Sequence, residues 1–354
     1  MRKCFALLIP VFIAVLAAAS PSVAQEPGAD TKDTVKRSIE KLDDALDALI
    51  DTDAEIEQLS SGHKWTEGPV WNKQQKMLLF CDIPNNEINR WDAATGEVTV
   101  YMKPSGYDGL ENGRSKESGT NGLIYGQDGR LIACDHGNRR LYRLYEDGSK
   151  ATLIDRFEGK RFNSPNDLVM DKAGNIFFTD PPYGMLNESV REIEWHGVYR
   201  LTPSGVVTLL TKEFTRPNGV ALSPDEKTLY VAQSDPKASI YKSFSLNEDG
   251  RIGEGKLLYD AKSLSKDPGL PDGMAIDQKG NLWATGPGGV LIISPEGKLL
   301  GRIMMSKPTA NCTFGDDGST LYITSSGYVC RVKTKARGWG LPIHPRPVEA
   351  TSLL

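Results

Sequence analysis

The sequence predicts an all-β protein, a six-bladed β-propeller, on two observations. Six units each begin with a polar corner and continue as a short apolar strand, a Gly- or Asp-rich turn and a second apolar strand. Several units then add an aromatic and basic third strand, as in RLYRL around Tyr142 and GVYRL around Tyr199. Antiparallel units that recur every ~40 to 50 residues are typical of propeller blades. The six corners, which are 54, 45, 52, 54 and 39 residues apart in succession, are Glu67, Asn121, Asn166, Asn218, Asp272 and Asn311.

The first 24 residues predict a secretory signal peptide. Met1-Arg2-Lys3 is basic, Phe5 to Ala19 is apolar, and Ser22-Val23-Ala24 places small residues before a cleavage site near Ala24–Gln25. The apolar run of 15 residues is short for a hydrocarbon core of ~30 Å. We therefore expect a periplasmic or secreted protein without a membrane anchor.

Composition and charge favour a soluble globular protein that acts on small molecules. The chain has 354 residues, 39% hydrophobic and 25% charged, which is enough to bury a large core. Loss of Arg2 and Lys3 with the leader leaves 40 basic and 46 acidic residues. Because nucleic acid is bound by a basic face, this acidic balance argues against a nucleic-acid partner. The oligomeric state is left open by the sequence.

The N-terminal segment, residues 25–53, is expected to carry an amphipathic helix. Apolar residues from Val35 to Ile50 recur at helical spacing among Lys, Glu and Asp between Thr34 and Asp51. The propeller itself is assigned to residues 54–335, with the alternating segment AEIEQL (54–59) as the outer strand of the last blade, which would close the ring. Residues 336–354 are expected to form a C-terminal tail.

Four cysteines remain after the leader is removed: Cys81, Cys134, Cys312 and Cys330. Their number permits two disulfides in an oxidising compartment. However, Cys81 and Cys134 occupy equivalent places in successive units, where side chains usually lie too far apart to bridge. We expect free, buried thiols, and the sequence does not exclude a disulfide.

The corners predict a site for a hard cation. The innermost strands of a propeller line its central channel, so the first residues of these strands meet around one axis. Taken singly, each Asn-Gly or Asp-Gly pair is explained by its preference for turns. As a set they offer carboxylate and amide oxygens without Cys or His, which suits Ca²⁺, and the two carboxylates of Glu67 and Asp272 balance its charge.

Five motifs, each in a different part of the chain, resemble the gluconolactonase family, which includes regucalcin (senescence marker protein) and luciferin-regenerating enzyme. These are TEGPVW at Thr66, NSPNDLV at Asn163, FTDPPYG at Phe178, RPNGVALSPD at Arg216 and PDGMAID at Pro271. The resemblance runs from about Ile56 to Val332 and implies a six-bladed propeller with a catalytic divalent ion, usually Ca²⁺, with Mn²⁺ or Zn²⁺ as alternatives. By motif, it places the metal ligands on Glu67, Asn166, Asn218 and Asp272.

Other residues are weighed as contacts to the substrate or to the ligands. Asn121 and His136 are candidates to bind substrate, with a structural hydrogen bond as the alternative for His136. Tyr183, on the rigid DPPYG turn, is a candidate wall of the substrate site, and Asp167 is expected to orient Asn166 from behind. Arg139 is more simply a surface arginine. Tyr142, Tyr199, Tyr230 and Tyr322 recur with the repeat and are expected in the core between blades.

The expected function is a Ca²⁺-dependent lactonase that opens a sugar lactone such as gluconolactone. The cation would polarise the lactone carbonyl, and Asp272 is the expected general base for an attacking water, with metal-held hydroxide as the alternative. No G-x-S-x-G motif is present, which disfavours serine chemistry. The alternatives are a phosphotriesterase-type hydrolase at the same site and a non-catalytic propeller with a structural Ca²⁺ that binds a partner.

Overall fold

The structure is a computed structural model that describes Met1 and residues 37–107, 109 and 117–340. The apolar run of the leader, the cleavage site and the tail beyond residue 340 therefore lie outside the described residues. No helix in the described part of the chain is long and apolar enough to cross a membrane.

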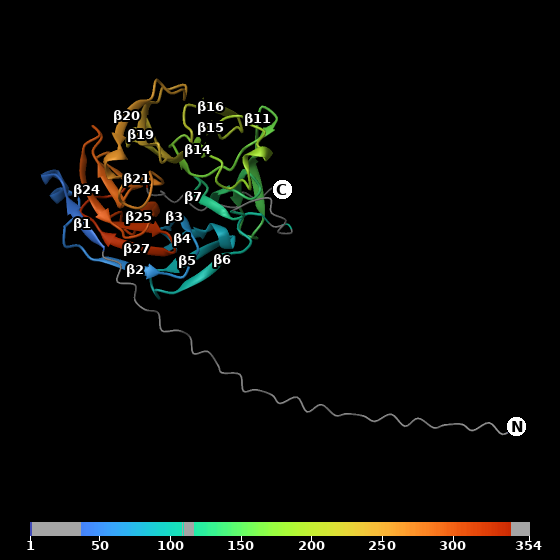
Figure 1. Ribbon diagram of the computed structural model, residues 1–354, viewed down its shortest axis with the longest axis horizontal. Coiled ribbons are helices and arrows are strands. Elements are labelled where there is room, and N and C mark those ends of the chain that lie inside the picture. Colours follow the sequence, from blue (N-terminus) through green and yellow to red (C-terminus); the bar gives the residue numbers. More distant parts are fainter. Residues whose placement is uncertain (2–36, 108, 110–116, 341–354) are drawn as a thin grey trace, which may run out of the picture. The chain divides into compact units, whose positions relative to one another are not determined.

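The described strands form six large antiparallel sheets, one for each predicted unit, and one two-stranded hairpin, which confirms the six-bladed propeller (Figure 1). Each sheet runs outward from its innermost strand. Blade 1 comprises β3 (Thr66–Asn72), β4 (Met77–Asp82), β5 (Glu87–Asp92) and β6 (Val98–Met102). Blade 2 comprises β7 (Thr120–Tyr125), β8 (Leu131–Asp135), β9 (Arg140–Leu144) and β10 (Lys150–Ile154). Blade 3 comprises β13 (Leu168–Met170), β14 (Ile176–Asp180), β15 (Gly197–Leu201) and β16 (Val207–Thr211).

The second half of the chain continues the same pattern. Blade 4 comprises β17 (Pro217–Leu222), β18 (Thr228–Asp235), β19 (Ala238–Ser245) and β20 (Lys256–Asp260). Blade 5 comprises β21 (Met274–Ile276), β22 (Leu282–Gly286), β23 (Gly289–Ile293) and β24 (Leu299–Met304). Blade 6 comprises β25 (Thr309–Gly315), β26 (Thr320–Ser325) and β27 (Tyr328–Lys333). A small hairpin, β11 (Arg156–Phe157) and β12 (Lys160–Arg161), joins blades 2 and 3, and short 3₁₀ turns lie at η2 (Ile83–Asn85), η3 (Glu188–Val190) and η4 (Ala261–Leu264).

The ring closes as the alternating segment before the first corner predicts. Strand β2 (Ile56–Ser60) pairs antiparallel with β27 and becomes the outer strand of blade 6. At the centre, each innermost strand contacts the innermost strand of the next blade, and β25 contacts β3 in the same way. Pairing the two ends of the chain within one sheet removes the free edges that a linear row of blades would leave.

The predicted N-terminal amphipathic helix is wrong for the residues that the structure describes. Residues 38–41 form strand β1 (Ser38–Lys41), which pairs with β24 as a fifth strand of blade 5, and η1 (Asp44–Ala48) is a short 3₁₀ helix. Ile39 lies opposite Ile303, and Leu46 and Ile50 are buried in the same core cluster. The apolar spacing marked the buried residues correctly. The outer edge of β24 favours a paired strand over helix because it offers unpaired backbone groups.

Aromatic side chains pack between blades, as the repeat predicts. Tyr142, Tyr199, Tyr230 and Tyr322 are all buried, in clusters that draw on neighbouring blades. The Tyr199 ring stacks on Phe178 of its own blade with ring centroids 5.4 Å apart, and the Tyr322 ring of blade 6 stacks on Trp71 of blade 1 with ring centroids 5.2 Å apart. Burial of such large side chains at each junction makes the positions of neighbouring blades depend on one another.

The cysteines among the described residues are free and buried, which agrees with the expectation of thiols without disulfides. Two of them donate to backbone carbonyls of a neighbouring blade. The Cys81 thiol donates to the Asn121 carbonyl at 3.0 Å, and the Cys312 thiol donates to the Trp283 carbonyl at 3.0 Å. These thiols thus serve as small buried donors between blades.

Candidate metal centre and active site

The six corner residues meet at the inner ends of the blades and are called the corner ring below. In four blades the corner lies at a register shift of the innermost strand: Glu67/Val70, Thr120/Leu123, Pro217/Val220 and Thr309/Asn311. In blades 3 and 5 the corner precedes β13 and β21. A bulge bends its strand and redirects a side chain that regular pairing would place on the sheet face. The repeated corner is therefore a repeated local distortion at the channel.

The glycines after the corners are required for close approach between neighbouring blades. A Cβ on Gly219 would lie 2.1 Å from the Asp272 carbonyl oxygen, and one on Gly68 would lie 2.0 Å from the Asn121 carbonyl oxygen. A Cβ on Gly122 would lie 2.7 Å from the Asn166 carbonyl oxygen, and one on Gly273 would lie 2.0 Å from the Asn311 side chain. Of these four glycines, only Gly68 has a positive φ. Turn preference thus does not explain most of the corner glycines, whereas contact with the next corner does.

Small polar side chains at the ends of the second strands hold the corner of the next blade. Thr179 Oγ1 donates to the Asn218 carbonyl at 2.7 Å, and Thr285 Oγ1 donates to the Ala310 carbonyl at 2.8 Å. Ser234 donates to the Pro271 carbonyl, and Cys81 occupies the equivalent place in blade 1. Four of the six blades therefore hold the corner of the next blade through a buried hydrogen bond to the corner residue or to the residue before it.

Two of the predicted ligands, Asn166 and Asn218, have their amide nitrogens bound elsewhere. Asn218 Nδ2 donates to Ser234 Oγ at 2.9 Å, and Asn166 Nδ2 lies 3.5 Å from His136 Nε2. Both side chains are buried. Because an amide has one nitrogen and one oxygen, fixing the nitrogen leaves the carbonyl oxygen as the group that can accept from, or bind, something else.

Asn311 has the opposite amide orientation. Its Oδ1 accepts from the backbone N–H of Cys312 at 2.8 Å. Burial raises the pKa values of Glu67 and Asp167, and hydrogen bonding to the Asn311 side chain opposes this rise. Asn311 is therefore a donor to carboxylates, which fits its omission from the predicted ligand set.

The acidic corners interact strongly with each other. Burial raises the pKa of Glu67 to about 8, and the charge of Asp167 adds to this effect. Burial also raises the pKa of Asp272 well above its ordinary value, with the charges of Glu67 and Asp167 as the next causes. Like charges that cannot be solvated favour the protonated form. A positive charge between these carboxylates would reverse this effect.

Asp167 spans two blades. Its Oδ1 accepts from the backbone N–H of Leu168 at 3.0 Å, and its Oδ2 accepts from the N–H of Val220 at 3.2 Å. Burial raises its pKa to about 7. These bonds fix the inner ends of blades 3 and 4 immediately behind Asn166 and Asn218. The predicted role of Asp167 behind the ligands remains a prediction, and the structure places it where such a role requires.

The other candidates divide into those at the corner ring and one elsewhere. His136 is fully buried beside Asn166. The Tyr183 hydroxyl is buried without a hydrogen-bonding partner among the described residues, and its pKa is raised by burial and by the charge of Asp272. Asn121 is buried in the ring itself. Arg139 instead donates to the backbone carbonyls of Phe162 and Asn163 at 2.6 and 3.1 Å, so its role there is structural.

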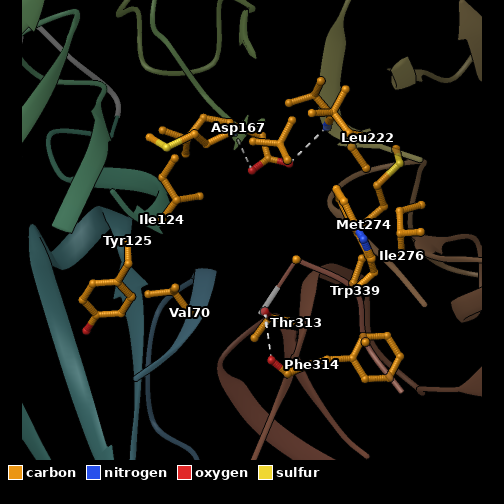
Figure 2. A pocket seen from close by; sticks show the side chains of 18 of the residues that line it. Val70, Ile124, Tyr125, Asp167, Leu222, Met274, Ile276, Thr313, Phe314 and Trp339 are labelled. Atoms are coloured by element: carbon orange, nitrogen blue, oxygen red, sulfur yellow. Dashed lines mark hydrogen bonds between the residues drawn. The ribbon is translucent and has the colours of Figure 1, made fainter. Parts of the chain in front are cut away.

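The channel below the corner ring contains a cavity of about 610 Å³. Figure 2 shows its apolar walls, with Asp167 at one end and Phe314 and Trp339 further along. Trp339 belongs to the C-terminal segment, and its backbone N–H donates to the Ile276 carbonyl at 2.8 Å. The four predicted metal ligands do not line this cavity. The predicted metal ligands therefore belong to the corner ring and not to this cavity.

The donor set fits a hard cation that prefers oxygen ligands. The described part of the chain contains no group of three or more His, Cys, Asp or Glu side chains that could hold a metal ion by themselves. The predicted shell contains only two such side chains, Glu67 and Asp272, and takes the remaining oxygens from the oriented amides of Asn166 and Asn218. Neutral carbonyl ligands beside two carboxylates are common for Ca²⁺ and unusual for Zn²⁺.

Sequence reasoning missed Ser234 and Glu117. Ser234 orients Asn218, and Glu117 Oε2 lies 3.2 Å from His136 Nδ1. A signal for Ser234 exists in the repeat, because the next-to-last residue of each second strand is a Cys, Thr or Ser. These residues are Cys81, Cys134, Thr179, Ser234, Thr285 and Thr324. Glu117 lies in a long connection between blades, where no repeat marks it.

Comparisons with known proteins agree with this architecture. A family model described as "SMP-30/Gluconolactonase/LRE-like region" matches residues 65–327. The chain is 38% identical over 349 residues to a gluconolactonase from Zymomonas mobilis, covering 95% of this chain and 98% of that protein. It is 31% identical over 275 residues to regucalcin from Xenopus laevis, covering 76% and 85%. A solved structure of a gluconolactonase from Xanthomonas campestris superposes with a TM-score of 0.74 at 32% identity, covering 84% of this chain and 94% of that one. Because the matched region includes all six corners of the propeller, the chain belongs to the SMP-30/gluconolactonase/LRE-like family.

Proposed function

We propose that this protein is a lactonase that opens a sugar lactone such as gluconolactone by attack of water, with a divalent cation, Ca²⁺ in the first place, held at the corner ring. The observation that carries the proposal is the pairing of two acidic groups with raised pKa values, Glu67 and Asp272, with two amides whose nitrogens are hydrogen-bonded elsewhere. The similarity to a gluconolactonase over almost the whole of both chains supports the lactone as substrate class.

The residues of the corner ring would have different roles in binding the cation and in the reaction. Glu67, Asn166, Asn218 and Asp272 would hold the cation through their side-chain oxygens. When bound, the cation supplies a Lewis acid that draws electron density from the lactone carbonyl. Asp272 is partly exposed, whereas Glu67 is buried. Asp272 is therefore the carboxylate that a water at the mouth can reach, and we assign it as the general base that takes the proton of that water.

Tyr183 and Asn121 would contact the substrate. The Tyr183 hydroxyl is buried close to Asp272, Ser234 and Asn218, but it makes no hydrogen bond of good geometry with any of the described residues. A buried, unpaired hydroxyl costs free energy unless a ligand satisfies it. A hydroxylated lactone offers both donors and acceptors to this hydroxyl, whereas an apolar ester offers acceptors alone.

Two other functions are tested by the same experiment. A phosphotriesterase would use the same cation on a phosphoryl oxygen, and a binding propeller would keep the cation only as a structural part. We would assay aldonolactones and an organophosphate triester with metal-free protein, with Ca²⁺ restored, and with Mn²⁺ or Zn²⁺. Chelator-sensitive lactone hydrolysis that Ca²⁺ restores supports the proposal, whereas undiminished hydrolysis after metal removal refutes the metal mechanism.

A matched pair of variants separates the site from general charge effects. Glu67→Gln removes one acidic oxygen from the corner ring. Glu226→Gln makes the same change at the cavity, where Glu226 accepts from the Lys172 N–H at 3.0 Å. Loss of Ca²⁺ binding and hydrolysis in the first variant alone would locate the cation at the corner ring. Equal losses in both would contradict that location.

We also propose export to the periplasm or the medium, with cleavage near Ala24–Gln25. The support is the order of the basic, apolar and small residues in the first 24 residues. N-terminal sequencing of the exported protein should begin at or near Gln25. An intact Met1 on exported material would refute this proposal.

A further inference from the structure

His136 is a fully buried histidine that lies between two polar partners. Its Nδ1 lies 3.2 Å from Glu117 Oε2, and its Nε2 lies 3.5 Å from Asn166 Nδ2. A Cβ on Gly184 would lie 2.6 Å from the His136 Cβ, so the DPPYG turn packs directly against this residue. The imidazole is therefore enclosed, and its contacts are with Glu117 and Asn166 rather than with solvent.

These contacts fix which nitrogen of the imidazole carries the proton. A carboxylate only accepts hydrogen bonds, so Nδ1 must donate to Glu117. In the neutral ring the other nitrogen, Nε2, is then an acceptor and faces the Asn166 NH₂ group. If the Asn166 amide turned over, its carbonyl oxygen would face the Nε2 lone pair, and two acceptors would meet in a buried place.

We propose that His136 and Glu117 are positioning residues that set the orientation of the Asn166 amide, so that its carbonyl oxygen faces the cation site. This inference rests on the cation site of the proposed function. His136 does not touch substrate or cation; it acts through Asn166. Ser234 performs the matching task for Asn218, since it donates to the Pro271 carbonyl and can only accept from the Asn218 nitrogen.

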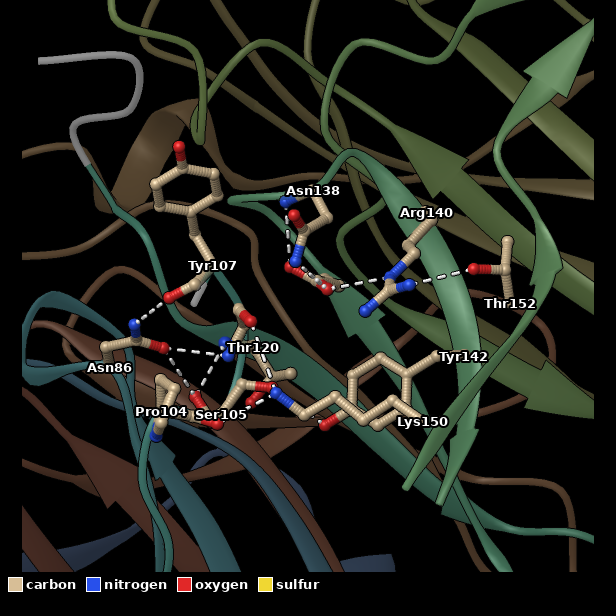
Figure 3. Close-up of polar contacts among 12 residues, drawn as sticks. Asn86, Pro104, Ser105, Tyr107, Thr120, Asn138, Arg140, Tyr142, Lys150 and Thr152 are labelled. Carbon is tan, nitrogen blue, oxygen red and sulfur yellow. Dashed lines mark hydrogen bonds and ion pairs between the residues drawn. The ribbon is translucent and has the colours of Figure 1, made fainter. Parts of the chain in front are cut away.

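Hydrogen bonds hold the backbone on both sides of Glu117, in the connection between β6 and β7. Tyr107 N–H donates to the Ser118 carbonyl at 2.8 Å, and Gly119 N–H donates to the Ile83 carbonyl at 3.2 Å. Asn86 Nδ2 donates to the Tyr107 carbonyl at 2.7 Å, and Ser105 Oγ accepts from the Thr120 N–H at 3.1 Å (Figure 3). His136 N–H in turn donates to the Gly119 carbonyl at 3.2 Å. Blades 1 and 2 therefore hold Glu117 beside His136.

The test measures cation affinity, because an oriented ligand affects binding before any chemistry. We would titrate metal-free protein with Ca²⁺ by calorimetry and with Tb³⁺ by luminescence. His136→Leu removes the acceptor without changing a fixed charge, and the affinity should fall by about 10- to 100-fold, the usual cost of losing a partner behind a metal ligand. His136→Gln, which offers an amide oxygen as acceptor, should recover most of this loss.

Asn166→Asp provides the decisive background. A carboxylate has two oxygens and no NH₂ group to place, so its orientation does not depend on His136. His136→Leu should therefore lower Ca²⁺ affinity in the Asn166 protein and leave it within about twofold in the Asn166→Asp protein, a coupling that a double-mutant cycle measures directly. An equal loss in both backgrounds would show that His136 acts through packing and would overturn the inference, as would unchanged affinity in His136→Leu.

Glu117 gives a second route if His136→Leu does not fold. Glu117 is a negative charge close enough to influence Glu67 and Asp272, so its charge and its hydrogen bond must be separated. Glu117→Gln removes the charge and keeps an acceptor for Nδ1, whereas Glu117→Leu removes both. Several-fold weaker Ca²⁺ binding by Glu117→Leu than by Glu117→Gln supports the inference, and equal affinities overturn it.

A control histidine and the wild-type protein separate this inference from the proposed function. His63 also has a polar partner on each nitrogen, with Ser60 Oγ at 2.6 Å from Nε2 and Asp82 Oδ2 at 3.6 Å from Nδ1. His63→Leu should leave Ca²⁺ affinity unchanged. Wild-type protein that binds no divalent cation refutes the proposed function itself. Wild-type binding with unaltered His136→Leu affinity refutes only the role of His136.

Discussion

Gly219→Ala tests whether the corner glycines exist for turn formation or for contact between blades. Gly219 does not have a positive φ, so its backbone conformation is open to alanine. If turn preference were the reason for this glycine, alanine would be tolerated and would stabilise the protein by ~0.4–1 kcal/mol through the unfolded chain. The structure predicts the opposite sign, because the new Cβ would lie 2.1 Å from the Asp272 carbonyl oxygen.

The size of the effect follows from this distance. An ordinary contact begins near 3.4 Å, so the Asp272 backbone must move by ~1 Å or more, and overpacking of this kind costs ~1–3 kcal/mol. Because Asp272 is the proposed base and a ligand, a shift of ~1 Å should also lower turnover by ~10²-fold. The measurements are denaturant unfolding and lactone hydrolysis at saturating Ca²⁺.

Gly126→Ala is the matched control. It also lacks a positive φ, and its new Cβ would meet the ends of the Asp128 and Ile132 side chains at 2.9 and 3.1 Å, whereas the new Cβ on Gly219 would meet backbone atoms. Its unfolding free energy should change by no more than ~0.5 kcal/mol, with turnover unaltered. A Gly219→Ala protein that is as stable and as active as Gly126→Ala would refute the argument from close approach.

Three further predictions follow from the corner ring and the core. Asp272→Asn keeps a carbonyl oxygen for the cation but removes the base, so turnover at saturating Ca²⁺ should fall by ~10²-fold or more while affinity weakens modestly. Near-normal turnover would move the role of base to metal-held hydroxide. In protein freed of metal by a chelator, the free energy of unfolding should fall as pH rises from the ordinary Glu67 pKa of 4.5 to its folded value of about 8, because the folded state keeps a proton that the unfolded chain releases. Ca²⁺ should abolish this fall when unfolding by urea is measured. A flat pH profile without Ca²⁺ would contradict the raised pKa. The four thiols of the described chain are free and buried, so they should react with a thiol reagent only after unfolding, and dithiothreitol should leave the melting temperature unchanged; fast reaction of native protein would contradict their burial.

Most of the fold could be predicted from the sequence because the same sequence pattern recurs in every blade of a propeller. Each corner, turn and aromatic third strand recurs along the chain, so an error in one unit is corrected by the others. Ring closure by residues 56–60 could also be predicted. Apolar and polar residues alternate there before the first corner, which indicates a strand, and a strand needs a partner. The N-terminal segment occurs once, and its apolar spacing suits a helix as well as a strand followed by a 3₁₀ turn. Pairing with β24 decided between them.

The sequence by itself determined which residues meet around the axis, because equal units in a closed ring must bring equal positions together. It could not determine which atom of each corner faces inward. The amides of Asn218 and Asn311 look alike in the sequence, yet Ser234 binds the nitrogen of one and the Cys312 N–H binds the oxygen of the other. Likewise, Glu117 and His136 lie 19 residues apart and meet only because blades 1 and 2 pack side by side. Amide orientation depends on partners from other blades, and those partners are set by tertiary packing.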